Sequence, residues 1–63
     1  MRTRFWMDTE DGKEVEVVAN FSDGILIDIE AFSYADSAKT QVNLNERELD
    51  AAEARAIAIA SES

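Results

Sequence analysis

Between Thr3 and Phe32 the sequence alternates apolar and polar residues, and two Asp-Gly turns interrupt the alternation. A period of two residues is typical of β-strands, because successive side chains of a strand point to opposite faces of a sheet. Aspartate followed by glycine is a hairpin signal, since glycine readily adopts the left-handed backbone that tight turns require. The stretch therefore predicts three antiparallel strands, at about residues 2–9, 13–21 and 25–33.

The register of the first hairpin follows from its hydrophobic pattern. A three-residue loop at Glu10–Gly12 places Met7 opposite Val15, so that apolar side chains meet on one face. A two-residue turn would instead place Met7 opposite Glu16 and mix the two faces. We therefore expect the three-residue loop.

The second hairpin is expected to repeat the first. A three-residue loop at Ser22–Gly24 pairs Phe21 with Ile25. The core face of the third strand would then carry Ile25, Ile27, Ile29 and Ala31, and the outer face would carry Leu26, Asp28, Glu30 and Phe32.

A helix start is marked by Asn45, which can cap, and by Glu48, which can reach back as its capping-box partner. Strong helix formers follow, so we expect a helix at about residues 46–60. Before it, the pattern favours a turn at 34–37 and a short fourth strand at about residues 39–43, with an undetermined register. One side of the helix is apolar and mostly alanine: Leu49, Ala52, Ala56, Ile57, Ile59 and Ala60.

These elements predict an α+β fold in which a three-stranded, or with the short strand four-stranded, antiparallel meander carries one C-terminal helix on one face. Sixty-three residues form a single domain, 1–63, with a small core. The alanine side of the helix suits close packing on the sheet, which needs a cover. The alternative is that this side serves as a dimer seam.

The chain is strongly acidic, with 14 Asp and Glu against six Lys and Arg and a formal charge of −8. Such a charge opposes binding to nucleic acid and to anionic membranes, and it favours partners with basic clefts. The alternative interpretation is solubility alone. No segment resembles a signal peptide or reaches the length of a membrane span, so we expect a cytoplasmic protein.

The composition argues against an enzyme, because the chain contains no histidine and no cysteine. We expect no cofactor and no metal. Asp8–Gly12 resembles a calcium loop superficially, but its glycine comes one place too early and the twelfth position is Ala19.

The expected register gathers carboxylates on the outer face of the sheet. Glu16 would lie opposite Glu30 on one side and Trp6 on the other, Glu14 opposite Asp8, and Asp28 opposite Val18. Like charges that face each other across strands are destabilising, so this pattern favours a function. With the two turn aspartates added, the candidate partner-binding residues are Trp6, Asp8, Asp11, Glu14, Glu16, Asp23, Asp28 and Glu30.

A sheet presents same-face residues about 6.6–6.8 Å apart along a strand and about 4.8 Å apart between strands. Phosphates succeed one another by about 3.4 Å of axis per DNA strand, so a carboxylate grid approaches the charge density of nucleic acid. Trp6 beside acids is a composition common in binding hot spots. Its alternative role is burial under the fourth strand, the chain end or Arg4.

The meander with Asp-Gly turns, followed by the segment Val42–Glu53, resembles small acidic proteins encoded by phages and prophages. Within that group the chain is similar in size and charge to DNA-mimicking anti-CRISPR proteins of type I systems, type I-C among them. The resemblance covers most of the chain. The segment Val42–Glu53 is largely the start of a capped helix, so the resemblance assigns no residue a role. It implies a basic nucleic-acid-binding complex of the host as the partner.

Two hypotheses result. The first is a phage-encoded inhibitor, active in the host bacterial cytoplasm, whose acidic sheet face blocks the DNA-binding site of a defence complex without itself binding nucleic acid or membrane. The second is a small structural or protein-interaction module in which the acids serve solubility only. We expect a monomer for the first, whereas the second admits a homodimer.

Overall fold

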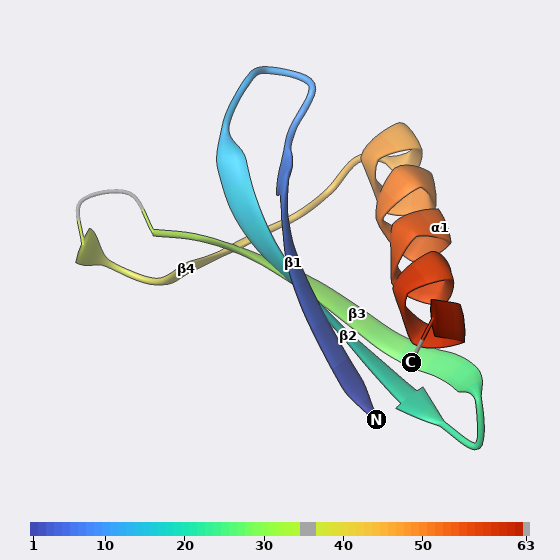
Figure 1. Cartoon of the computed structure of the whole chain (residues 1–63). Helices are drawn as coiled ribbons and strands as arrows, with labels where there is room; N and C mark the ends of the chain where they lie inside the picture. Colours follow the sequence, from blue (N-terminus) through green and yellow to red (C-terminus); the bar gives the residue numbers. More distant parts are fainter. Residues whose placement is uncertain (35–36, 63) are drawn as a thin grey trace.

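The computed structural model describes residues 1–34 and 37–62. Its strands form one antiparallel sheet in the order β1-β2-β3-β4, and a single helix follows them (Figure 1). The predicted α+β meander with a C-terminal helix is therefore confirmed, with the short fourth strand present. The element bounds are β1 Arg2–Asp8, β2 Glu14–Ser22, β3 Ile25–Ser33, β4 Thr40–Val42 and α1 Glu46–Glu62.

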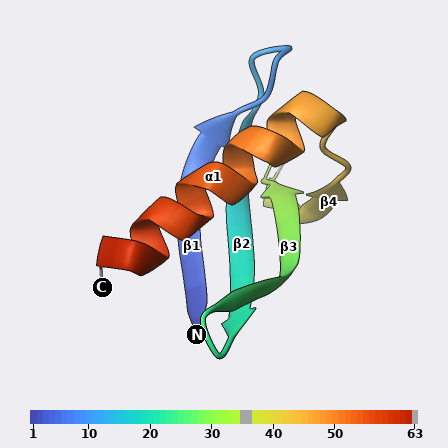
Figure 2. The same ribbon diagram turned by 90° about the vertical axis from the view of Figure 1, so that its right-hand side faces the viewer.

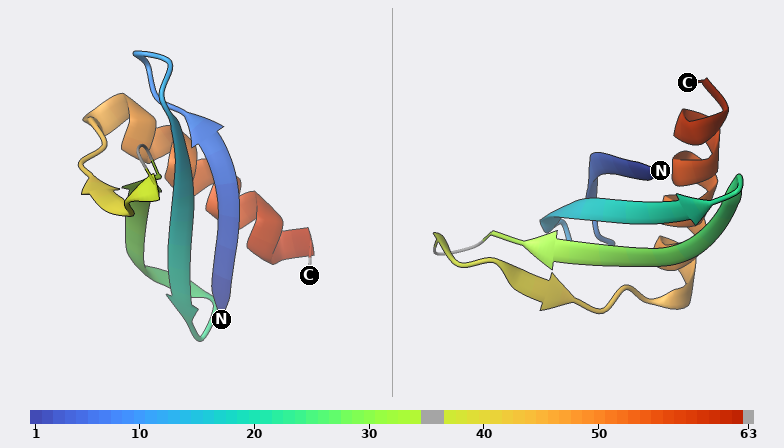
Figure 3. Two further views of the ribbon diagram at one scale, coloured as in Figure 1. Left: turned by 90° about the vertical axis from the view of Figure 1, so that its left-hand side faces the viewer. Right: turned by 90° about the horizontal axis from the view of Figure 1, so that it is seen from below.

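The sheet and the helix form two layers. α1 crosses one face of the sheet and packs mainly on β1 and β2 (Figure 2). Seen from the other side, the sheet lies in front of the helix, and no described helix or strand covers it (Figure 3, left). We call this uncovered side the outer face. It is the side on which the sequence placed the carboxylates.

The core lies between the sheet and α1, and the odd-numbered residues of β1 and β2 form its floor. Val15, Val17 and Ala19 are fully buried there. Ala52 and Ala56 of α1 are also fully buried, because their small side chains let the helix approach the sheet closely. The rest of the buried core is Phe5, Phe21 and Ala31.

The first hairpin has the predicted register. Met7 pairs with Val15, and the Thr9 amide donates to the Lys13 carbonyl at 2.7 Å, which closes a three-residue loop. Gly12 has a φ of 87°, a left-handed conformation that costs glycine little.

The second hairpin differs from the prediction. Ser22 pairs with Ile25, so the turn has two residues, Asp23 and Gly24, with φ angles of 54° and 79°. Two successive positive φ angles define a turn whose twist matches that of the strands it joins. The register then shifts between Asn20 and Phe21, where a β-bulge adds a residue to β3.

The bulge changes which side chains of β3 enter the core. Leu26 pairs with Phe21 and packs against the core, although the sequence placed it outside. Ile25 and Ile27, predicted to face inward, are 66% and 64% exposed. Beyond the bulge the prediction holds, since Ile29 packs against the core and Ala31 is buried.

The helix begins as predicted. The Asn45 amide donates to Oε1 of Glu48 at 2.9 Å, and the Glu48 amide donates to Oδ1 of Asn45 at 2.8 Å, which is a reciprocal capping box. Ile57 was expected on the side of the helix that packs on the sheet, but it is 51% exposed. In the described part of the chain, no helix combines the length and the apolar character needed to cross a membrane.

Before the helix, β4 pairs with the end of β3 and places Val42 opposite Ala31. The predicted turn at 34–37 includes residues 35 and 36, which lie outside the described residues.

Candidate partner-binding face

Three predicted site residues of the outer face come together around Trp6. Asp8 pairs with Glu14, and Trp6 pairs with Glu16, as the sequence predicted. In an antiparallel pair, side chains directly opposite each other have Cβ atoms about 4.5–5.5 Å apart. These neighbouring pairs form what we call the acidic end of the outer face: Trp6, Asp8, Glu14 and Glu16.

The predicted pairing of Glu16 with Glu30 is wrong. Glu16 lies opposite Phe32, and Glu30 lies opposite Val18. Asp28 lies opposite Asn20 instead of Val18. The cause is the two-residue turn together with the bulge, which move this part of β3 by two residues relative to the expected register.

The remainder of the outer face carries both signs of charge. Arg4 and Glu30 flank Val18 from its two sides, and Arg2 and Asp28 flank Asn20. Arg2 also donates from Nε to Oδ1 of Asn20 at 3.1 Å. A shallow hollow lies on this part of the face, and residues of both charges line it: Arg2, Arg4, Glu16, Val18, Asn20, Glu30, Phe32, Tyr34 and Lys39. Asp28 and Glu30 therefore belong to a mixed-charge region and not to the acidic end.

Trp6 is 49% exposed, and an aromatic neighbour covers part of it. The ring of Tyr34 lies 5.7 Å from that of Trp6 at an interplanar angle of 53°. The Tyr34 hydroxyl donates to Oε1 of Glu16 at 2.6 Å. The hydrogen bond to Glu16 is the main reason why the pKa of Tyr34 is raised above 10.0.

Tyr34 is the site residue that sequence reasoning missed. It follows β3 in sequence but reaches β1 and β2 on the outer face. With Trp6, Lys13, Glu14 and Ser33 it lines a second shallow hollow beside the acidic end. The only signal in the sequence was an aromatic residue next to the end of an amphipathic strand.

The two turn aspartates lie at opposite ends of the sheet (Figure 1). Asp11 accepts a hydrogen bond from the Thr9 hydroxyl, which is the largest cause of a lowered pKa for the Asp11 carboxyl. Asp23 is the first residue of the second turn, far from the acidic end. The structure thus places Asp23 far from Asp8, Glu14 and Glu16, whereas Glu30 lies diagonally from Glu16 and lines the mixed-charge hollow with it.

The acids at the start of α1 contribute mainly to structure. Besides capping the helix, Glu48 accepts the Glu10 amide at 2.7 Å through Oε2. Asn45 donates from Nδ2 to Oε1 of Glu10 at 2.8 Å, so the helix cap is joined to the first turn. Among residues 1–34 and 37–62, no group of three or more acidic side chains is arranged to hold a metal ion.

Comparison of the chain with protein-family models, with curated proteins and with solved structures gave no match.

Proposed function

We propose that the protein is a phage-encoded inhibitor that uses its acidic surface to mimic DNA and to block the basic nucleic-acid-binding site of a host defence complex. A type I CRISPR surveillance complex is the first target to test. The observation that carries the proposal is the acidic end: Asp8, Glu14 and Glu16 lie beside a half-exposed Trp6 on a sheet face that α1 leaves uncovered.

Geometry and charge support this use of the face. Neighbouring strands lie about 4.8 Å apart, compared with about 3.4 Å of helix axis per phosphate along one DNA strand, so facing carboxylates approach the charge density of DNA. Asp8 opposite Glu14 opposes folding through repulsion, a cost that a partner's lysines and arginines would relieve.

The aromatic pair gives the acidic end a second component of affinity. Trp6 and Tyr34 offer apolar area beside the carboxylates, and tryptophan and tyrosine are enriched among the residues that dominate interface energies. The hydrogen bond from Tyr34 fixes the Glu16 carboxylate in place before binding, so less side-chain entropy is lost on association. We expect the mixed-charge region to contribute less.

The test is competition with DNA. A purified type I-C surveillance complex is incubated with the protein and then with a labelled target duplex, and bound DNA is measured at several salt concentrations. The proposal expects DNA binding to be blocked, and the block to weaken steeply as salt rises. The double variant Glu14→Lys, Glu16→Lys should lose the block.

The matched control is Asp50→Lys with Glu62→Lys. Both residues are exposed on α1 and away from the outer face. Each double variant replaces two negative charges with two positive ones, so both change the charge of −8 by the same amount. Equal loss in the control and the test variant would attribute the effect to overall charge, and an undiminished block by the test variant would refute the proposal.

A second candidate function is a small protein-interaction module, with a homodimer as one form and the acids serving solubility. The exposed Ile25 and Ile27 favour it. A dimer through the alanine side of α1 is not proposed, because Ala52 and Ala56 are fully buried in the core. Sedimentation over a range of concentrations separates a dimer from a monomer.

A further inference from the structure

The outer edge of β3 has a strand partner along only part of its length. β4 pairs with Ala31–Ser33, whereas β2 lies along the opposite edge of the strand. After β4 the chain leaves the sheet toward the start of α1, and no described strand lies beside the first half of β3 (Figure 2). The edge formed by Ile25–Glu30 is thus open to a further strand.

The other edge strand, β1, is protected by charged side chains. Arg55 of α1 donates to the Trp6 carbonyl at 3.0 Å and lies 5.0 Å from the ring centre of Phe5. Arg2 and Arg4 are exposed along the same strand. Positive side chains of this kind discourage unwanted strand pairing. The Ile25–Glu30 segment contains no such residue, and Ile25 and Ile27 are both largely exposed.

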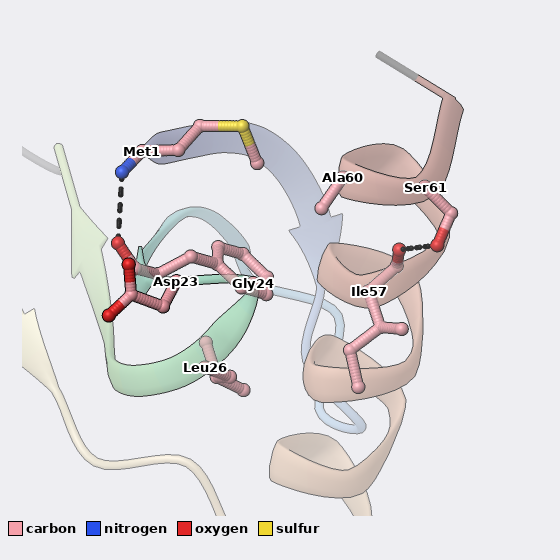
Figure 4. Close-up of a pocket in the computed structure, with 8 residues that line it drawn as sticks. Met1, Asp23, Gly24, Leu26, Ile57, Ala60 and Ser61 are labelled. Carbon is pink, nitrogen blue, oxygen red and sulfur yellow. Dashed lines mark hydrogen bonds between the residues drawn. The ribbon is translucent and has the colours of Figure 1, made fainter.

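An apolar hollow of about 520 Å³ opens beside the same segment, between the second turn and the last turns of α1. Leu26 and Ile57 lie on opposite sides of it, with Met1 at its rim (Figure 4). Because α1 packs mainly on β1 and β2, the helix does not close the hollow over β3.

The side-chain charges on this edge itself are negative, whereas the nearest positive groups are the Met1 ammonium at the hollow and Lys39 over the Phe32 ring. Asp23 lines the hollow, and Asp28 and Glu30 lie on the outer face of β3. Arg2 and Arg4 are two strands away on β1. A strand added along β3 would therefore direct one set of side chains toward the hollow and the alternate set toward carboxylates.

We propose that the Ile25–Glu30 edge binds an extended segment of another protein by strand addition, and that this segment alternates apolar residues with lysine or arginine. Backbone pairing supplies affinity in this mode, and the alternate side chains supply specificity. A second copy of this chain fits less well, because it brings another Asp28 and Glu30 to an already negative edge.

This inference goes beyond the proposed DNA mimicry, since it concerns a different surface. The two proposals can be refuted separately. Glu14→Lys with Glu16→Lys should abolish the block of DNA binding without altering the β3 edge. Ile27→Lys should alter the β3 edge without altering the acidic end.

The probe is a synthetic peptide in which valine alternates with lysine. It has about six residues, which is the usual length of a strand. The control peptide has the same composition with the lysines and valines in two blocks. Binding to the isotope-labelled protein is followed by amide chemical shifts and by hydrogen exchange. The alternating peptide should shift and protect amides within Ile25–Glu30 and leave those of β1 unprotected.

Ile27→Lys should weaken binding of the alternating peptide by about tenfold or more, because it places a positive charge on the edge. Ala58→Lys, at an exposed position of α1, adds the same charge and should leave binding unchanged. Equal binding of both peptides, protection outside β3, or no effect of Ile27→Lys would overturn the proposal. Protection of the β3 edge that rises with protein concentration, without peptide, would assign the edge to a second copy and would also overturn it.

Discussion

The Tyr34 hydroxyl donates a hydrogen bond of 2.6 Å to Oε1 of Glu16 on the central strand β2. Through this bond the residue that follows β3 is held over the outer face, with its ring beside Trp6 on β1. An aromatic pair and a carboxylate from three separate parts of the chain thus form one contact surface at the acidic end.

The first prediction concerns the titration of Tyr34, the chain's only tyrosine. Hydrogen bonding to Glu16 raises the pKa of Tyr34 above 10.0, so tyrosinate absorbance should appear at a higher pH than in the unfolded chain. Because the folded pKa is the higher one, this bond's contribution to stability is present below about pH 10 and is lost as pH rises through the folded pKa.

Glu16→Gln should lower the midpoint of the Tyr34 titration, because the neutral amide no longer disfavours tyrosinate electrostatically. Glu30→Gln is the control and should leave the midpoint unchanged. An ultraviolet absorbance titration measures both, and the same midpoint in Glu16→Gln and the unaltered protein would contradict the hydrogen bond.

The second prediction concerns the facing carboxylates Asp8 and Glu14. Asp8→Asn should raise the free energy of unfolding by about 0.2–1 kcal/mol, because it removes repulsion between directly opposed like charges. In the Asp8→Asn variant, Glu14→Gln should raise the free energy of unfolding by less than it does in the unaltered protein. Urea denaturation followed by Trp6 fluorescence measures the coupling.

Glu16 and Glu30 provide the comparison for this pair of substitutions, since they are not opposite each other. The effects of Glu16→Gln and Glu30→Gln on the free energy of unfolding should be additive to within about 0.5 kcal/mol. Coupling as strong as that between Asp8 and Glu14 would indicate the register of a three-residue second turn without the bulge.

The third prediction tests the capping box of α1. Asn45→Ala should lower the free energy of unfolding by about 1–2 kcal/mol, because it leaves the Glu48 amide without its acceptor and breaks the bond to Glu10. Asn43→Ala, an exposed asparagine two residues earlier, should change it by less than about 0.5 kcal/mol. Equal effects in thermal or urea unfolding would argue against the cap.

The fourth prediction compares Ile27 with Ile29, which the sequence assigned to the same face. Ile27→Thr should cost less than about 0.5 kcal/mol of stability, because the side chain is 64% exposed. Ile29→Thr should cost about 2 kcal/mol, since Ile29 packs against the core and the hydroxyl would replace apolar contacts. Similar losses of stability for the two variants would contradict the bulge.

Local patterns were sufficient for most of the fold. The alternation of β1 and β2 fixed their register, because a shift of one residue would expose Val15 and bury Glu16. The helix start was predictable for the same reason: a capping box involves only residues three apart, Asn45 and Glu48.

The second hairpin was not predictable from the hydrophobic pattern. The observed and expected registers differ by two residues beyond the bulge, and a shift of two keeps every side chain on its own face. Near the turn, Ile25, Leu26 and Ile27 are all apolar, so any of them suits the core. Beyond the bulge the sequence therefore predicted which residues of β3 share the outer face, but it failed to predict which residues of β2 they face. Tyr34 was missed because its partners are distant in sequence.

The two oxygens of the Glu48 carboxylate hold the start of α1 and the turn between β1 and β2 at once. At the other end, Glu46–Glu62 carries no basic residue in its last turn to interact favourably with the helix dipole. Fraying should therefore start near Ser61 and advance toward Asn45, so that the first turn of the helix is the last to melt.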